Sequence, residues 1–301
     1  MIYYHHSYSQ LDLPAHHRFP ISKYQQLYAR LQQGPLAQYL STPSQAATRE
    51  MLLGCHHPEY VDAFLQGTLS DKAIKKMGFP WSQTLVARTM TSVGASIEAA
   101  KFALQHGVAA NLSGGYHHAH PDFGSGFCIF NDWAVAAAHL INQELAEKVV
   151  IFDCDVHQGD GTATCTALRD NIVSCSVHCE SNFPRVKPAS DYDFALPQGC
   201  QDERYLETIS DALQLVIRLH QPDIILYNAG ADIYQGDELG QLNVSKPGVK
   251  ARDSLVMQLA AQHNTPLAIA LGGGYQRDVK HLVDIHEQTF LALFDNLAIM
   301  I

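Results

Sequence analysis

A short apolar run ends in three potential metal ligands at alternate positions, Asp153, Asp155 and His157. In an extended backbone, side chains two positions apart point the same way, so these three are expected to converge. Cys154 and Val156 would then face the packing side. Carboxylate and imidazole groups at this spacing suit a divalent metal such as zinc. Because a bound metal lowers the pKa of its water and polarises a carbonyl, the pattern predicts hydrolytic chemistry.

A further carboxylate, Asp232, closes a polar segment at 228–232 that follows another apolar run. With Asp155 and His157 it forms a plausible one-metal set that leaves positions open for water and substrate. The alternative is that acidic residues at strand ends cap helices or solvate loops. All three residues occur in the same kind of context, and this favours the metal site.

Two adjacent histidines, His117 and His118, lie in a glycine-containing loop after a buried strand pattern. Histidine is the side chain best suited to proton transfer near neutral pH. Asp153 and Asp160 are available to fix the tautomers of the two rings. The alternative is a pair of structural histidines with satisfied hydrogen bonds.

A tyrosine, Tyr275, follows three glycines at 272–274. The segment lacks both the dinucleotide glycine pattern and the lysine-serine pair of a phosphate loop, so it is a weak candidate for nucleotide binding. A hydroxyl on a glycine loop is better suited to donate a hydrogen bond to a developing oxyanion. The alternative is an ordinary buried tyrosine.

Alternating strand and helix patterns must position these groups. The predicted strands are 108–112, 149–153, 172–177, 223–228 and 266–271, with a possible strand at 1–5. The predicted helices are 22–33, 58–66, 83–105, 132–145, 202–220, 247–262 and 278–296. Apolar strands separated by helices indicate an α/β fold with a mostly parallel sheet buried on both faces. All four polar clusters follow strands, and ligands bind beyond the carboxyl ends of strands in such sheets.

Composition narrows the function classes. The chain has 301 residues, 47% of them hydrophobic, and a formal net charge of −10, which argues against a general nucleic-acid binder. We expect no membrane association, because no apolar run approaches the ~20 residues of a membrane span. No signal peptide is evident, and seven scattered cysteines favour reduced thiols in the cytoplasm. Cys55 beside His56 could indicate a metal, but no partner is evident in the sequence. The sequence pattern predicts no particular oligomeric state.

Five motifs in order resemble the zinc-dependent histone deacetylase family, which also includes acetoin-utilisation proteins. They occupy residues 113–118, 126–132, 152–161, 228–232 and 272–275. The resemblance extends from about residue 15 to the C-terminus. The segment 227–240, and Gln158 directly after His157, are similar to the class IV-like branch.

The resemblance implies the arginase/deacetylase fold, as a single catalytic domain over 1–301 with a mostly parallel sheet of about eight strands. It implies zinc, or iron, at Asp155, His157 and Asp232. It makes His118 the main general base and acid, with His117 tuning charge. The implied supporting residues are Asp153 and Asp160 behind the two histidines, Tyr275 as donor to the carbonyl oxygen, and Gly126, Phe127 and Phe183 around the acyl group. A structural potassium is implied at Asp153, Ser176 and the backbone of Asp155, His157 and Val177.

The resemblance is incomplete at the rim, because an acidic residue that grips the substrate backbone is not found. The corresponding segment, 77–81, is apolar. The expected activity is therefore removal of an acyl group, with acetyl favoured, from lysine or a related amine, and small amines and unusual acyl chains stay open. One rival is a binuclear hydrolase of the arginase type, for which the bridging carboxylate after His157 is missing. The other is a non-catalytic acyl-ligand or interaction module.

Overall fold

The computed structural model describes residues 1–14 and 16–300, and its described part forms one sheet of eight parallel strands. The strand order is β2-β1-β3-β8-β7-β4-β5-β6. The strands are β1 (Ile2–Tyr3), β2 (Leu40–Ser41), β3 (Val108–Asn111), β4 (Val149–Asp153), β5 (Ile172–Cys179), β6 (Tyr192–Leu196), β7 (Ile224–Asn228) and β8 (Leu267–Ala270). The predicted α/β class and the sheet of about eight strands are confirmed.

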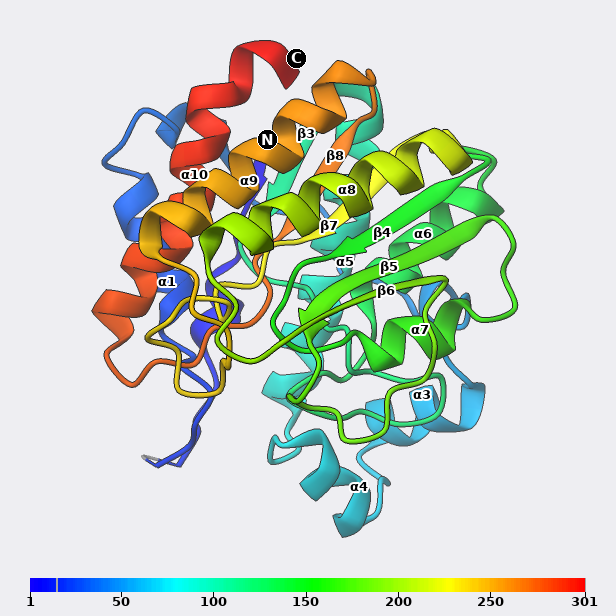
Figure 1. Cartoon of the computed structure of the whole chain (residues 1–301). Helices are drawn as coiled ribbons and strands as arrows, with labels where there is room; N and C mark the ends of the chain where they lie inside the picture. Colours follow the sequence, from blue (N-terminus) through cyan, green and yellow to red (C-terminus); the bar gives the residue numbers. More distant parts are fainter. Residues whose placement is uncertain (15, 301) are drawn as a thin grey trace.

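Helices cover both faces of this sheet (Figure 1). On one face lie α1 (Lys23–Leu31), α8 (Asp202–His220), α9 (Lys246–Gln262) and α10 (Val279–Met300). On the other lie α5 (Gln83–His106), α6 (Asp132–Asn142) and α7 (Asp160–Thr166). The remaining helices are α2 (Arg49–Leu52), α3 (Pro58–Gln66), α4 (Asp71–Met77) and the 3₁₀ helices η1 (His6–Ser9) and η2 (Ala37–Tyr39). No described helix is both long and apolar enough to cross a membrane.

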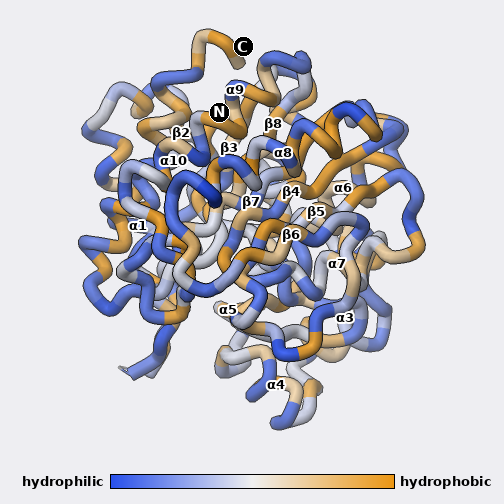
Figure 2. Tube along the Cα trace, in the orientation of Figure 1, coloured by the Kyte–Doolittle hydropathy of each residue, from blue (hydrophilic) through white to orange (hydrophobic). Residues whose placement is uncertain are grey.

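The central strands are buried along their whole length, because helices exclude water from both faces. Figure 2 shows hydrophobic residues along these strands, with more hydrophilic loops around them. This is why the apolar runs at 149–153 and 223–228 predict strands within a residue of their observed limits. The strands β2 and β6 were not predicted. They are the two edges of the sheet, and the alternating exposure of β6 leaves it without a continuous apolar run.

The helix predictions agree with the structure where a cap or a long amphipathic pattern is present. Asn131 caps α6 by accepting a hydrogen bond from the Ala134 N–H at 3.0 Å. Pro247 lies in the first turn of α9, as predicted. Three short helices, α2, α4 and α7, were missed, since a run of four to seven residues carries little periodic signal.

The parallel register brings the predicted clusters to one edge of the sheet. Asp153 at the end of β4 pairs with Asn228 of β7 on one side and Ser176 of β5 on the other. Because β4 ends at Asp153, the strand alternation proposed for 153, 155 and 157 was wrong beyond its first residue. Asp155 and His157 instead lie in the loop that leaves the strand.

Candidate active site and metal centre

The residues Asp155, His157 and Asp232, here called the donor set, converge at the carboxyl end of β4 and β7. Their ligand atoms all lie within 4.8 Å of one another, and all three residues are buried. His157 Nδ1 lies 3.0 Å from Asp155 Oδ1 and 3.3 Å from Asp232 Oδ2. The structure therefore brings together three side chains that the sequence placed on two separate segments.

The donor set has the properties of a cation site. Asp232 Oδ2 is buried and has no hydrogen-bond partner in the described part of the chain. Burial and the neighbouring Asp155 carboxylate raise the pKa of Asp232. Two buried carboxylates side by side are costly unless a positive charge compensates them. Two carboxylates and one imidazole are also a donor combination that zinc accepts, so the residues present fit a divalent metal.

Backbone N–H groups from two loops hold the two carboxylates in place. Asp232 Oδ1 accepts from the Val156 N–H at 3.0 Å, and Asp155 Oδ2 accepts from the Gly273 N–H at 2.8 Å. Gly273 approaches both carboxylates so closely that a Cβ there would lie 2.0 Å from Asp232 Oδ2. A side chain at position 273 would thus displace the donor set, which explains one of the glycines in the 272–274 run.

The two adjacent histidines each contact a different carboxylate. His117 Nδ1 lies 2.6 Å from Asp153 Oδ2, and His118 Nδ1 lies 2.5 Å from Asp160 Oδ1. The ring centroids of the two histidines are 4.1 Å apart, and His117 Nε2 lies 3.7 Å from Asp155 Oδ1. Each imidazole therefore has one nitrogen fixed by an aspartate and the other directed into the site.

The surroundings shift the pKa values of the two histidines in opposite directions. Burial lowers the pKa of His118 to about 4, and the neighbouring positive charge of His117 acts in the same direction. Burial also disfavours the charged form of His117, but the Asp153 and Asp155 carboxylates outweigh it and raise its pKa to about 9. His118 is thus the neutral ring near pH 7, available to accept a proton.

Sequence reasoning missed a third histidine in this network. His120 Nε2 lies 3.2 Å from the second oxygen of Asp160, and His120 Nδ1 lies 2.8 Å from Thr164 Oγ1 of α7. Asp160 therefore contacts the rings of both His118 and His120. These contacts tie the start of α7 to the segment 117–120. The sequence signal was weak, because His120 is separated from the adjacent pair by one alanine.

Tyr275 is positioned by two charged residues, Asp237 and Lys23, to which the sequence analysis gave no role. Its backbone N–H donates to Asp237 Oδ2 at 2.7 Å. Lys23 of α1 is buried, and its Nζ donates to the carbonyls of Gly272 and Gly274 at 3.3 and 3.5 Å. Burial raises the pKa of Tyr275 well above its usual value, and the Asp155 charge adds to the effect, so the hydroxyl keeps its proton.

Two phenylalanines lie beside these groups, as the resemblance implied. The Phe183 ring meets His118 edge to face at 4.8 Å and is 44% exposed. The Phe127 ring lies 5.9 Å from that of Tyr275, and its backbone adopts φ 65° next to Gly126. The site therefore has apolar walls on two sides.

The apolar rim segment supports one of these walls. The Phe127 N–H donates to the Met77 carbonyl at 3.0 Å, and Gly78 packs directly against the Phe127 ring. Beyond this wall, a cavity of about 670 Å³ opens next to Tyr275 and is lined by residues 11–14 and 16–22, Glu238, Gln276, Arg277 and Val279. The segment 77–81 thus contributes packing rather than charge.

The implied potassium residues also lie together. Asp153 and Ser176 are register partners on β4 and β5, and both line a small internal cavity with Gly159. Asp153 Oδ1 accepts from the Asp155 N–H at 3.1 Å and from Asn228 Nδ2 at 3.0 Å. Ser176 Oγ lies 3.0 Å from His178 Nδ1. Asp153 is therefore shared between the histidine pair and the end of the sheet.

Comparisons with known proteins place the chain in a family. Residues 17–290 match the family model described as the histone deacetylase domain. An uncharacterized protein of Picosynechococcus is 40% identical over 286 residues, 95% of each chain. Histone deacetylase 2 of Arabidopsis thaliana is 32% identical over 194 residues, 64% of this chain and 50% of that protein. The acetoin utilization protein AcuC of Staphylococcus aureus is 29% identical over 273 residues, 83% of this chain and 69% of that protein.

Solved structures show the same fold. The HD domain of HDA15 superimposes with a TM-score of 0.79 at 20% identity, covering 99% of this chain and 95% of that one. A histone deacetylase homologue from Aquifex aeolicus gives a TM-score of 0.81 at 21% identity, covering 98% of this chain and 83% of that one. With the family model matching most of its length, this chain belongs to the histone deacetylase family.

Proposed function

We propose that the protein is a metal-dependent amide hydrolase that removes an acyl group, with acetyl favoured, from lysine side chains or related amines. One observation carries the proposal: two histidine–aspartate pairs and Tyr275 lie beside the buried donor set at one edge of the sheet. Membership of the deacetylase family supports the same reaction class.

The donor set would hold zinc through Asp155, His157 and Asp232, and iron is the alternative because such a site accepts both. When bound, the metal would polarise the acyl carbonyl and lower the pKa of the attacking water. The orphaned Asp232 Oδ2 supports this assignment. A potassium ion beside Asp153 and Ser176 is proposed from the family resemblance, and these two residues are register partners on β4 and β5.

His118 is proposed as the general base and acid. Its Nδ1 donates to Asp160, which leaves Nε2 to take a proton from the attacking water and return it to the departing amine. His117, held by Asp153 and carrying the higher pKa, would keep positive charge near the developing negative charge. The two aspartates therefore act by orienting the rings and fixing their tautomers.

Tyr275 is proposed as the donor to the oxyanion. Its hydroxyl stays protonated in this environment, and its loop is fixed at both the backbone N–H and the glycine carbonyls. A pre-oriented donor of this kind stabilises the tetrahedral intermediate more than the substrate.

The acyl chain would lie between Phe127 and Phe183, with the Gly126 carbonyl near the substrate amide. The rim at 77–81 offers no charged side chain to bind a peptide backbone, so acylated polyamines and other small acylated amines are proposed as substrates beside acyl-lysine proteins. The class IV-like assignment is proposed from the sequence resemblance alone, at Gln158 and the segment 227–240. Seven free cysteines support a cytoplasmic location.

The binuclear alternative finds less support. A second metal would need a bridging carboxylate two positions after His157, and that position is Gly159, which has no side chain to offer. A non-catalytic module would not require Tyr275, His118 and the donor set together.

The test is a hydrolysis screen over acyl-lysine peptides and acylated polyamines, with metal analysis on the same preparation. We expect turnover of at least one amide and one transition metal per chain. Two metals per chain would favour the binuclear enzyme. One metal with no amide hydrolysis across the screen would favour the binding module.

A further inference from the structure

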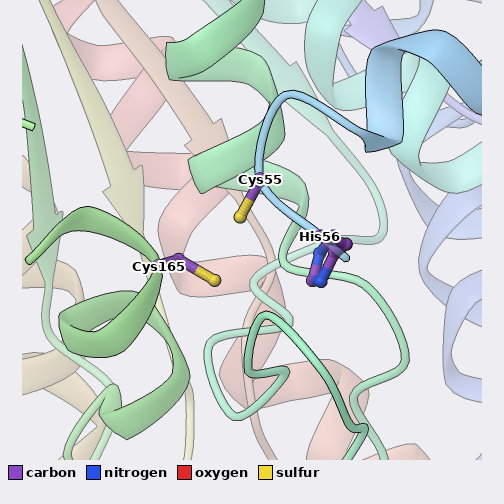
Figure 3. A group of neighbouring side chains, drawn as sticks. All are labelled: Cys55, His56 and Cys165. Carbon is purple, nitrogen blue, oxygen red and sulfur yellow. The ribbon is translucent and has the colours of Figure 1, made fainter. Parts of the chain in front are cut away.

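Two cysteines from distant parts of the chain meet outside the site described above. Cys55 follows α2, and Cys165 lies in the last turns of α7. With His56, their ligand atoms lie within 4.8 Å of one another. Figure 3 shows the two thiols directed toward each other across the space between the loop and the helix. The sequence offered no partner for Cys55, and the structure corrects this, because α7 brings Cys165 to it.

The ring of His56 is already engaged by the backbone. Its Nε2 accepts from the Asn131 N–H at 2.9 Å, so its Nδ1 carries the proton that is donated to the His120 carbonyl at 2.9 Å. A metal needs a free imidazole lone pair. His56 has none to offer unless the bond from the Asn131 N–H breaks, so the group is better described as a thiol pair, Cys55 and Cys165, beside a structural histidine.

The thiol pair lies at the surface, with Cys55 partly exposed and Cys165 buried behind it. A surface cavity of about 690 Å³ is lined by both cysteines and by Arg169. Arg169 donates to the Gly54 carbonyl, which holds its guanidinium next to Cys55. Burial alone would raise the pKa of the Cys55 thiol, but the Cys165 thiol and the neighbouring His56 ring outweigh it and lower that pKa, and the Arg169 charge acts in the same direction. A partly exposed thiolate with a second thiol beside it is the arrangement of a reactive dithiol.

We propose that Cys55 and Cys165 form a redox-sensitive pair that a peroxide converts into a reversible intramolecular disulfide. The Cys55 thiolate attacks one peroxide oxygen, the O–O bond breaks, and Cys55 becomes a sulfenic acid while the other oxygen leaves as hydroxide. The Cys165 thiol then attacks the sulfenic sulfur, the S–S bond forms and the S–O bond breaks. With the thiol proton and one from solvent, the two oxygens leave as water, so two electrons pass from the thiols to the peroxide.

The pair lies next to the segment that carries the active-site histidines. Cys165 Sγ donates to the carbonyl of Ala119 at 3.5 Å, and Ala119 directly follows His118. A disulfide would remove this donor. The inference nevertheless does not depend on the proposed hydrolysis, because its test detects the bond itself.

The test treats the whole reduced protein with hydrogen peroxide, blocks remaining thiols with an alkylating reagent under denaturing conditions, and maps the cysteines by mass spectrometry. We expect a Cys55–Cys165 cross-linked peptide that a dithiol reductant reverses, with the other five cysteines alkylated. Cys55→Ser and Cys165→Ser should each abolish the cross-link. Cys200→Ser, which replaces a buried free cysteine elsewhere, should form it like the wild type.

A second measurement keeps the inference falsifiable if either variant folds poorly. In the wild type, Cys55 should be alkylated at least about tenfold faster than Cys200 near neutral pH, because Cys55 is both more exposed and more fully ionised. Irreversible oxidation of Cys55 without a cross-link, or a disulfide between two molecules, would overturn the proposal. So would zinc that binds the reduced protein in addition to the donor-set metal and is lost in Cys55→Ser, since that result would make the group a metal site.

Discussion

The change Tyr275→Phe isolates one hydroxyl in an otherwise fixed site. The backbone N–H of residue 275 would still donate to Asp237, and the ring would still lie against Phe127, so phenylalanine should take the same position. Loss of one oxyanion donor lowers kcat by about 10²–10³, or roughly 2.7–4 kcal/mol of transition-state stabilisation. Metal content and thermal stability should stay unchanged, because Tyr275 is not in the donor set.

The assay is steady-state hydrolysis of the best acyl-lysine peptide, with metal analysis of the same samples. Because burial keeps the Tyr275 hydroxyl protonated, the ratio of wild-type to variant kcat should be constant from about pH 6 to about pH 9. Tyr192→Phe is the matched control. Tyr192 lies on the edge strand β6, and its hydroxyl is hydrogen-bonded to His220 at the end of α8. A Tyr275→Phe variant with kcat within threefold of the control would refute the oxyanion role.

Three further outcomes are expected. Asp160→Asn removes the carboxylate that lies 2.5 Å from His118 Nδ1. It should lower kcat by about 10²–10⁴-fold with unchanged metal content. Activity near that of the wild type would show that Asp160 does not orient His118. Chelation of the metal should lower the free energy of unfolding by about 4 kcal/mol relative to the protein in free zinc at ~1,000 times the Kd. The measurement is denaturant unfolding, and Asp232→Asn should abolish this difference. His286 is buried with both ring nitrogens unpartnered in the described part of the chain, and burial lowers its pKa well below 6.5. Below about pH 6.5 the unfolded chain therefore binds a proton at His286 that the folded chain does not. The free energy of unfolding should then fall by about 1.4 kcal/mol for each unit by which the pH is lowered. In His286→Leu this contribution to the pH dependence should be lost, as measured by urea unfolding at two pH values. An unchanged slope in the variant would contradict this account.

The sequence alone predicted most of the sheet and the longer helices. Buried parallel strands such as β4 and β7 are apolar throughout, and long helices such as α8 carry a full amphipathic pattern. The short elements were missed because α7 and the edge strand β6 carry no such pattern. The members of the candidate site were also visible, since each follows a strand and all parallel strands end at the same edge.

The sequence by itself determined which chemical groups stand at the end of each strand, because local patterning fixes strand, turn and ligand type. Only the tertiary structure decided which of them meet. The sheet order places β7 beside β4, and this brings Asp232 to Asp155 and His157. Lys23 and Asp237 reach the tyrosine loop, and Cys165 reaches Cys55, through packing between segments far apart in the chain. Such contacts depend on how helices and loops fold over the sheet, and no spacing within one segment encodes them.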